Sequence, residues 1–159
     1  MKVVFLDIDG VLNSQDFIIA THLKGILPDD KIDPEAVARL NQITDETGAI
    51  IVISSTWRLH YLWKKNIEGL KKLLKEEEGI TGTILDVTPD HQRYRGRGGE
   101  IQDWMDHCAQ PIESFIIIDD SDDMDHLLPR LIRTGFQKGL QDEHIKTAIE
   151  MLGKKSSIV

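Results

Sequence analysis

The sequence has little of several features that mark large classes of protein. Its 159 residues include one cysteine, Cys108, so an internal disulfide cannot form, and we expect a packing role for this thiol in a reducing, cytoplasmic setting. No apolar run approaches the roughly 20 residues that cross a bilayer, which predicts a protein without membrane contact. The histidines show no metal-ligand spacing with Cys108, which argues against a zinc site.

Positive charge is also scarce. The chain has 19 basic and 27 acidic residues, for a formal net charge of −8. Such a surface is repelled at long range by a nucleic-acid backbone, so any contact of that kind needs a local basic patch. The segment HQRYRGR, from His91 to Arg97, is the candidate patch, and its alternative interpretation is a solvated, flexible basic loop.

Short apolar runs alternate with amphipathic segments along most of the chain. Runs at 3–6, 50–53 and 115–118 are typical of strands buried on both faces, and weaker strand patterns occupy 83–87 and 131–134. Helices are predicted from Pro34 to Gly48 with Asp33 as the cap, and over 59–78, 99–107, 122–128 and 141–152. This alternation predicts one α/β domain over residues 1–153, a three-layer α/β/α sandwich with a parallel sheet, followed by a flexible tail at 154–159.

Polar groups follow three of the predicted strands directly. Asp7-Ile8-Asp9-Gly10 follows the first, Ser54-Ser55-Thr56 the second, and the acidic run from Asp119 to Asp123 the fourth. The carboxyl ends of parallel strands meet at one edge of a sheet, so these groups are expected to converge. Crowded carboxylates repel one another, and a divalent cation relieves this repulsion. Ligands that are all oxygen suit Mg²⁺.

Asp7 and Asp9 are two residues apart, which places both on one side of an extended chain, and Gly10 then permits a tight turn. In such a pair one carboxylate can attack phosphorus while the other handles the proton of the leaving group. An Asp-x-Asp pair on its own is more often part of a calcium loop or a solvated turn. The hypothesis of phosphoryl chemistry therefore depends on the ordered set of strand ends.

Together these segments resemble the motifs of the haloacid dehalogenase (HAD) superfamily, over Val3 to about Leu152. The matching segments are FLDIDGVLN, IVISS and FIIIDDSDD, and the segments SSTWR and RGRGGEIQDW are similar to a small capless branch that includes HAD domains of RNA-repair proteins. The resemblance implies a Rossmann-like sheet in the strand order 5-4-1-2-3 without a large cap domain. It also implies a magnesium-dependent phosphomonoester hydrolase that acts through an aspartyl-phosphate intermediate.

The resemblance assigns chemical roles to four acidic residues. Asp7 is the expected nucleophile, and Asp9 is the expected general acid and then base. Magnesium is expected on the Asp7 carboxylate, on the Asp9 carbonyl and on Asp120, with Asp119 in its outer shell or exchanging roles with Asp120.

Candidate substrate contacts come from the other motifs. Ser54 is expected to hydrogen-bond the transferring phosphoryl group, while Ser55 would face elsewhere in an extended strand, and the alternative for the pair is an ST-turn or a helix cap. The third motif usually supplies a lysine, and Arg97 is the best match here, with Arg95 and Arg93 as rivals. The remaining candidate substrate-binding residues are Gly10, Ser55, Arg58 and Arg95.

Several alternatives stay open at this level. Arg58 is expected either to hold substrate or to pair with a neighbouring acid. For Trp57 a place in the core is preferred to the alternative, an aromatic platform that stacks on the substrate. The segment from Asn13 to Asp33 is too short for a cap domain and is expected to form a flap in which Phe17, Ile18 and Ile19 shield the reaction.

The expected partner is a phosphorylated substrate. A nucleotide or a nucleic-acid end is favoured over a sugar phosphate, because the HQRYRGR segment mixes basic and aromatic residues. The alternatives to a phosphatase are a phosphotransferase and a non-catalytic binding module. The sequence predicts no particular oligomeric state.

Overall fold

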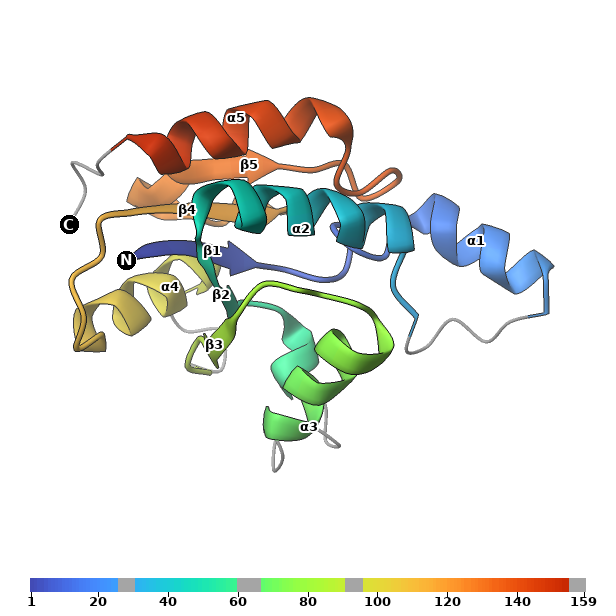
Figure 1. Cartoon of the computed structure of the whole chain (residues 1–159), viewed down its shortest axis with the longest axis horizontal. Helices are drawn as coiled ribbons and strands as arrows, with labels where there is room; N and C mark the ends of the chain where they lie inside the picture. Colours follow the sequence, from blue (N-terminus) through green and yellow to red (C-terminus); the bar gives the residue numbers. More distant parts are fainter. Residues whose placement is uncertain (26–30, 60–66, 91–95, 155–159) are drawn as a thin grey trace.

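The computed structural model describes residues 1–25, 31–59, 67–90 and 96–154, which form an open, five-stranded parallel sheet with helices (Figure 1). The strands are β1 (Lys2–Leu6), β2 (Ile50–Ile53), β3 (Ile84–Val87), β4 (Ser114–Asp119) and β5 (Leu131–Arg133). Their spatial order is β3-β2-β1-β4-β5, and neighbouring strands pair in parallel. This is the expected order 5-4-1-2-3.

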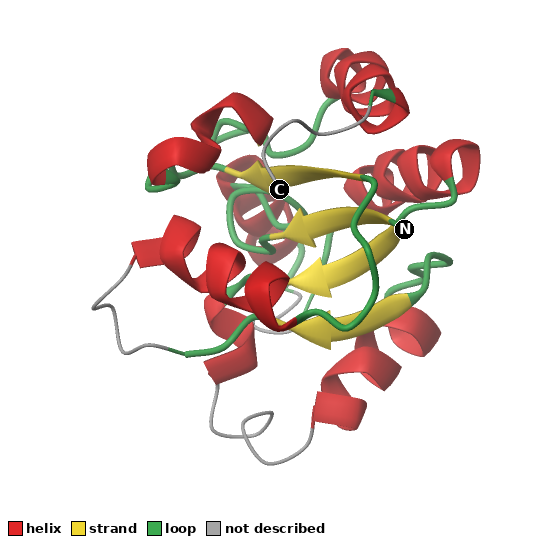
Figure 2. Cartoon of the chain, turned by 90° about the vertical axis from the view of Figure 1, so that its left-hand side faces the viewer, coloured by secondary structure: helices red, strands yellow, loops and turns green. Residues whose placement is uncertain are grey.

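Helices cover both faces of the sheet (Figure 2). Helices α2 (Pro34–Thr47), α3 (Ile67–Lys72) and α5 (Asp142–Gly153) pack on one face, over the first core, which includes Val4 and Leu6 of β1. Helix α4 (Gly96–His107) and the 3₁₀ helix η3 (Asp125–Arg130) cover the other face, over the second core, which includes Val3 and Phe5. Side chains alternate between the faces of a strand, so β1 is apolar on both sides and serves both cores.

The predicted helix ends near α2 are confirmed. The Asp33 side chain accepts a hydrogen bond from the Glu35 amide at 2.9 Å, and Gly48 ends the helix with a φ of 66°. Helix α5 and strands β3 and β5 lie within one residue of their predicted bounds. Cys108 is half-buried against the second core, in keeping with its expected packing role.

The helix predicted over 59–78 is wrong at its start. Leu59 instead belongs to a short 3₁₀ helix, η1 (Thr56–Leu59), and is its last residue. Two hydrogen bonds to Ser55 form the start of η1: the Trp57 amide donates to the Ser55 hydroxyl at 3.3 Å, and the Arg58 amide donates to the Ser55 carbonyl at 3.2 Å. Residues 60–66 lie outside the described part. Helix α3 begins at Ile67 and continues as a π-helical segment, η2 (Leu73–Glu77).

Two further helices differ from their predictions. Helix α4 begins at Gly96 and not at the predicted Gly99. Glycine disfavours helices, but tertiary contacts of the first turn, described with the site, stabilise it here. The helix predicted over 122–128 is instead η3, which starts at Asp125 and includes Pro129. Asp125 has a φ of 48°, and a left-handed residue interrupts an α-helix at that point.

The expected flap contains one helix, α1 (Gln15–Leu23), capped by the Ser14 side chain. In Figure 1 it extends beyond the carboxyl edge of the sheet, with Ile19 half-exposed. The described residues include no cap domain, and none of their helices has the length and apolar character needed to cross a membrane. The predicted tail at 154–159 lies outside the described residues except for Lys154.

Candidate active site

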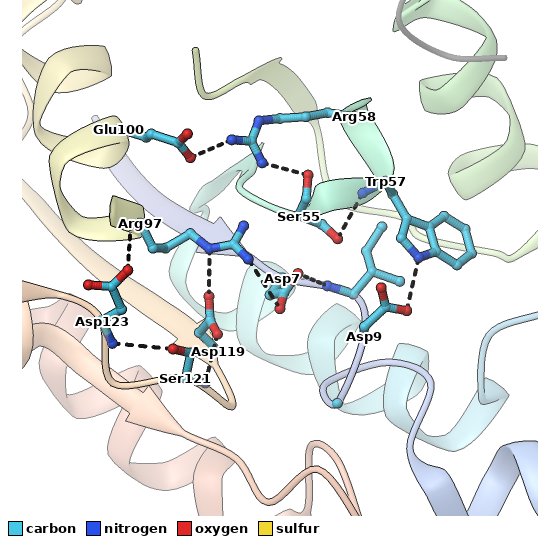
Figure 3. A network of polar contacts seen from close by, with 12 residues as sticks. Asp7, Asp9, Ser55, Trp57, Arg58, Arg97, Glu100, Asp119, Ser121 and Asp123 are labelled. Carbon is cyan, nitrogen blue, oxygen red and sulfur yellow. Dashed lines mark hydrogen bonds and ion pairs between the residues drawn. The ribbon is translucent and has the colours of Figure 1, made fainter. Parts of the chain in front are cut away.

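The candidate site lies at the carboxyl edge of the three central strands. Leu6 of β1 pairs with Ile53 of β2 and with Ile118 of β4, so the residues that follow these strands come level with one another. The ladder continues past the strands, because the Asp7 amide donates to the Ile118 carbonyl at 3.0 Å and the Ser54 amide donates to the Leu6 carbonyl at 2.8 Å. The three strand ends singled out in the sequence therefore meet, as predicted (Figure 3).

Asp7 is a buried carboxylate at the centre of this edge, with 5% of its surface exposed. Its Oδ1 accepts a hydrogen bond from the Ile8 amide at 2.8 Å. Burial raises the pKa of Asp7, and the Arg97 guanidinium and the Ser55 hydroxyl act in the opposite direction. The net effect is a raised pKa, and Arg97 and Ser55 are the groups that stabilise the ionised form of this poorly solvated carboxylate.

Asp119 and Asp120 bring further carboxylates to the same point. Asp7, Asp119 and Asp120 each offer an oxygen within 4.8 Å of the others. Asp119 is fully buried, and its Oδ1 accepts a hydrogen bond from the Ser121 amide at 2.9 Å. Burial raises the pKa of Asp119 to about 7, with repulsion from Asp7 adding to the effect and Arg97 opposing it.

Arg97 lies between these acids (Figure 3). Its Nε is 3.4 Å from Oδ2 of Asp119, and its Nη2 is 3.8 Å from Oδ2 of Asp7. Its Nη1 is buried and has no hydrogen-bond partner in the described part of the chain. A buried N–H group without a partner is costly, so this donor is suited to an anionic ligand.

The first turn of α4 holds Arg97 in place. The Arg97 amide donates to Oδ2 of Asp123 at 3.2 Å, and the Gly98 amide donates to the Asp123 carbonyl at 2.9 Å. A Cβ at Gly98 would lie 2.5 Å from the Met124 carbonyl oxygen, so only glycine permits this close approach. The acidic loop after β4 and the arginine therefore form one packed unit.

The donor set fits a hard divalent cation. Three carboxylates gather at one point, two of them, Asp7 and Asp119, pair with Arg97, and Oδ2 of Asp119 is buried with no hydrogen-bond partner among the residues described. Oxygen-only ligands of this kind are those that Mg²⁺ prefers, and a cation would lower the pKa of Asp119 and balance the remaining charge.

Asp9 faces the same edge and has partners of its own. Its Oδ1 accepts hydrogen bonds from the Trp57 indole at 2.9 Å and from the Asn13 side-chain amide at 2.8 Å. Trp57 also packs against the first core, which confirms its predicted core role. Sequence reasoning did not find the Trp57 and Asn13 contacts, since neither the turn η1 nor the loop after Gly10 has a sequence pattern that specifies them.

Of three comparisons with known proteins, one finds a match. The family model for the HAD domain in Swiss Army Knife RNA repair proteins matches residues 3–145, which is well over half of the chain. The chain belongs to this family. No curated protein and no solved structure matches the sequence.

The two serines of this HAD domain have different surroundings. The Ser55 hydroxyl lies beside Asp7 and lowers its pKa, whereas Oγ of Ser54 is fully buried without a hydrogen-bond partner in the described residues. Ser55 would face away from the site only in an extended strand, and the chain instead leaves the extended conformation at Ser55 and enters η1. The predicted ST-turn is present as well, through the Trp57 amide.

Arg58 has the second of its two predicted roles. Its buried guanidinium pairs with Glu100 of α4 and donates to the carbonyls of Thr88 at 2.9 Å and Ser55 at 2.6 Å. Burial lowers the pKa of Arg58, and Glu100 counteracts this effect. Arg58 thereby ties η1 to the helix that carries Arg97, and it also lines the cavity that opens beside Arg97.

The remaining candidates differ in how far the structure places them. Gly10 has a φ of 72°, and a Cβ there would lie 2.7 Å from Cγ of Asp120, so the predicted tight turn also makes room for the acidic loop. Arg93 and Arg95 lie outside the described residues. A cavity of about 300 Å³ opens beside Arg97 and is also lined by Thr56 and Asp123.

Proposed function

We propose that this HAD domain is a magnesium-dependent phosphatase that hydrolyses phosphomonoesters through a phosphoryl group held covalently on Asp7. The observation that carries the proposal is the placement of a buried carboxylate, Asp7, beside an arginine whose Nη1 has no hydrogen-bond partner among the described residues. A nucleophile and a donor for the phosphoryl oxygens are the two groups that such a transfer needs.

In the first step an Asp7 oxygen attacks phosphorus, and the bond from phosphorus to the leaving oxygen breaks. Asp9 gives its proton to that oxygen, so the product leaves as an alcohol. In the second step a water molecule attacks the same phosphorus, Asp9 takes its proton, and the bond from phosphorus to Asp7 breaks. Phosphate is released, and both carboxyl groups return to their starting states.

The other residues of the site support this reaction. The Arg97 guanidinium is positioned to bind phosphoryl oxygens, and Ser55 keeps the Asp7 carboxylate oriented. Asp7, Asp119 and Asp120 would hold Mg²⁺, with the Asp9 carbonyl as a further ligand. When bound, the ion reduces the repulsion between the carboxylate and the phosphate dianion.

We infer that the substrate is a nucleotide or a nucleic-acid end that carries a terminal phosphate. The family description, a HAD domain in RNA repair proteins, supports this class. An uncapped sheet edge would also leave room for a large substrate. Phosphate release should be faster from a phosphorylated oligonucleotide than from a sugar phosphate, and neutralising Arg93 and Arg95 should reduce this preference. A preference for the sugar phosphate that stays the same when Arg93 and Arg95 are neutralised would contradict this substrate class.

The activity itself is tested with an aryl phosphate, with and without Mg²⁺. We expect phosphate release that requires the ion, is abolished in Asp7→Asn, and is unchanged in Asp106→Asn, which alters an exposed aspartate on α4. If the wild type released no phosphate, the result would favour the alternative of a non-catalytic binding module. Transfer to an added alcohol in place of water would indicate a phosphotransferase.

A further inference from the structure

We propose that Trp57 is a positioning residue that orients the Asp9 carboxylate toward the leaving group. The inference rests on the proposed function, because it assigns a role within the same reaction. The two hydrogen bonds that reach this carboxylate from the described residues, from Trp57 and Asn13, both end on Oδ1. Oδ2 is therefore the oxygen that can face the leaving group.

The two contacts differ in what they attach Asp9 to. Asn13 belongs to the same loop as Asp9, and its carbonyl accepts a hydrogen bond from the Gly10 amide at 3.1 Å, so it moves with that loop. Trp57 comes from η1, after a different strand. Its indole N–H thus ties Asp9 to a separate element of the fold.

The element that carries Trp57 is itself firmly held. The Trp57 ring packs against the first core, and its amide donates to the Ser55 hydroxyl. The next residue, Arg58, is buried in its contacts with Glu100 and with backbone carbonyls.

Ser55 and the adjoining η1 therefore contact both catalytic carboxylates. The Ser55 hydroxyl hydrogen-bonds Asp7, and the Trp57 indole donates to Asp9 (Figure 3). Catalysis requires such groups to be placed within fractions of an ångström, and η1 sets the nucleophile and the proton donor relative to each other.

Loss of the indole N–H would leave Asn13, in the same loop, as the side chain of the described residues that holds the Asp9 carboxylate. The carboxylate would then turn away from the leaving oxygen, and that oxygen would depart with less help from a proton. The penalty grows with the basicity of the leaving group, because an alkoxide needs the proton more than a phenolate does. The dependence of rate on the leaving group is therefore the signature of this role.

Trp57→Phe tests the proposal, because it keeps an aromatic ring and removes the N–H. Trp104→Phe is the matched control, since the Trp104 indole also donates to a carboxylate, Oδ2 of Asp86 at 2.8 Å, but packs in the second core. The measurement is kcat/KM for an alkyl phosphate and for an aryl phosphate with an acidic phenol. In Trp57→Phe we expect a loss of about tenfold or more on the alkyl phosphate and a much smaller loss on the aryl phosphate. The loss on the alkyl phosphate is smaller than the roughly 10²–10⁴-fold that a general acid contributes, because Asp9 itself is still present. In Trp104→Phe the ratio of the two values should not change.

A readout without turnover accompanies the kinetics. In ¹⁵N-labelled protein, Asp9→Asn should shift the indole resonance of Trp57 and leave that of Trp104 in place. An unmoved Trp57 resonance, or equal losses on both substrates in Trp57→Phe, would overturn the inference even if the phosphatase activity is present. A wild type without Asp7-dependent activity on either ester would instead refute the proposed function, and the positioning role with it.

Discussion

Replacing Asp119 by asparagine should make the metal-free protein more stable at alkaline pH. The ordinary pKa of an aspartate is 3.8, and burial raises the pKa of Asp119 in the folded protein to about 7. The folded state therefore binds this proton more tightly than the unfolded chain does. Between about pH 4 and pH 7 unfolding releases the proton, so the free energy of unfolding falls as pH rises through this window.

The size of the effect follows from the same pKa values. The shift from 3.8 to about 7 is roughly three pKa units, and each unit corresponds to about 1.4 kcal/mol, so ionised Asp119 costs the folded state on the order of 4 kcal/mol above pH 7. Asparagine cannot ionise and avoids this cost. Urea unfolding in the presence of a chelator should show that the wild type loses stability between pH 5 and pH 8 relative to Asp119→Asn.

The control for this experiment is Asp122→Asn, on the same loop. The Asp122 side chain is exposed and pairs with Arg133 at 2.8 Å, so its replacement should leave the pH dependence almost unchanged. Mg²⁺ should stabilise the wild type more than Asp119→Asn, since it binds the assembled carboxylates. An Asp119→Asn protein that is less stable than the wild type at pH 8 would refute the account of a strained, buried carboxylate.

Three further predictions concern the surroundings of the site. Gly98→Ala should lower the free energy of unfolding by roughly 1–3 kcal/mol, measured by urea unfolding, because its Cβ would lie 2.5 Å from the Met124 carbonyl oxygen; an unchanged stability would mean that the loop yields easily. Arg58→Gln should cost roughly 3–5 kcal/mol, because it removes the positive charge that contacts the buried Glu100 carboxylate, and Arg58→Gln with Glu100→Gln should recover part of that loss. Arg97→Met should reduce kcat about 10²–10³-fold while far-UV circular dichroism stays unchanged, and Arg97→Lys should retain more activity than Arg97→Met. Equal rates in the wild type and both variants would exclude Arg97 from the reaction.

The arrangement of the strands could be predicted from the sequence because a general rule links pattern to position. Apolar runs that stop abruptly at Asp7 and Asp119 mark parallel strands, and the carboxyl ends of such strands meet at one edge. The expected convergence of the carboxylates follows from the register of β1, β2 and β4 alone. No side-chain detail is needed for it.

The partners of individual side chains depend on loop conformations, for which the sequence has no comparable rule. Ser55 reaches Asp7 because the chain turns into η1, and an extended strand would have pointed Ser55 elsewhere. Arg97 belongs to a helical turn that glycines would disfavour, and the contacts of Asp123 and Met124 stabilise that turn. The hydrogen bond from Trp57 to Asp9 likewise forms only once the tertiary structure places η1 beside the loop after β1.

The central claim is that a phosphoryl group passes through Asp7. The most direct measurement is a rapid acid quench of the protein with Mg²⁺ and a reactive aryl phosphate, followed by peptide mass spectrometry. The account predicts one added phosphoryl group on the peptide that contains Asp7, lost on treatment with hydroxylamine and absent in Asp7→Asn. Phosphate release without a phosphorylated peptide at any quench time, or release that persists in Asp7→Asn, would contradict it.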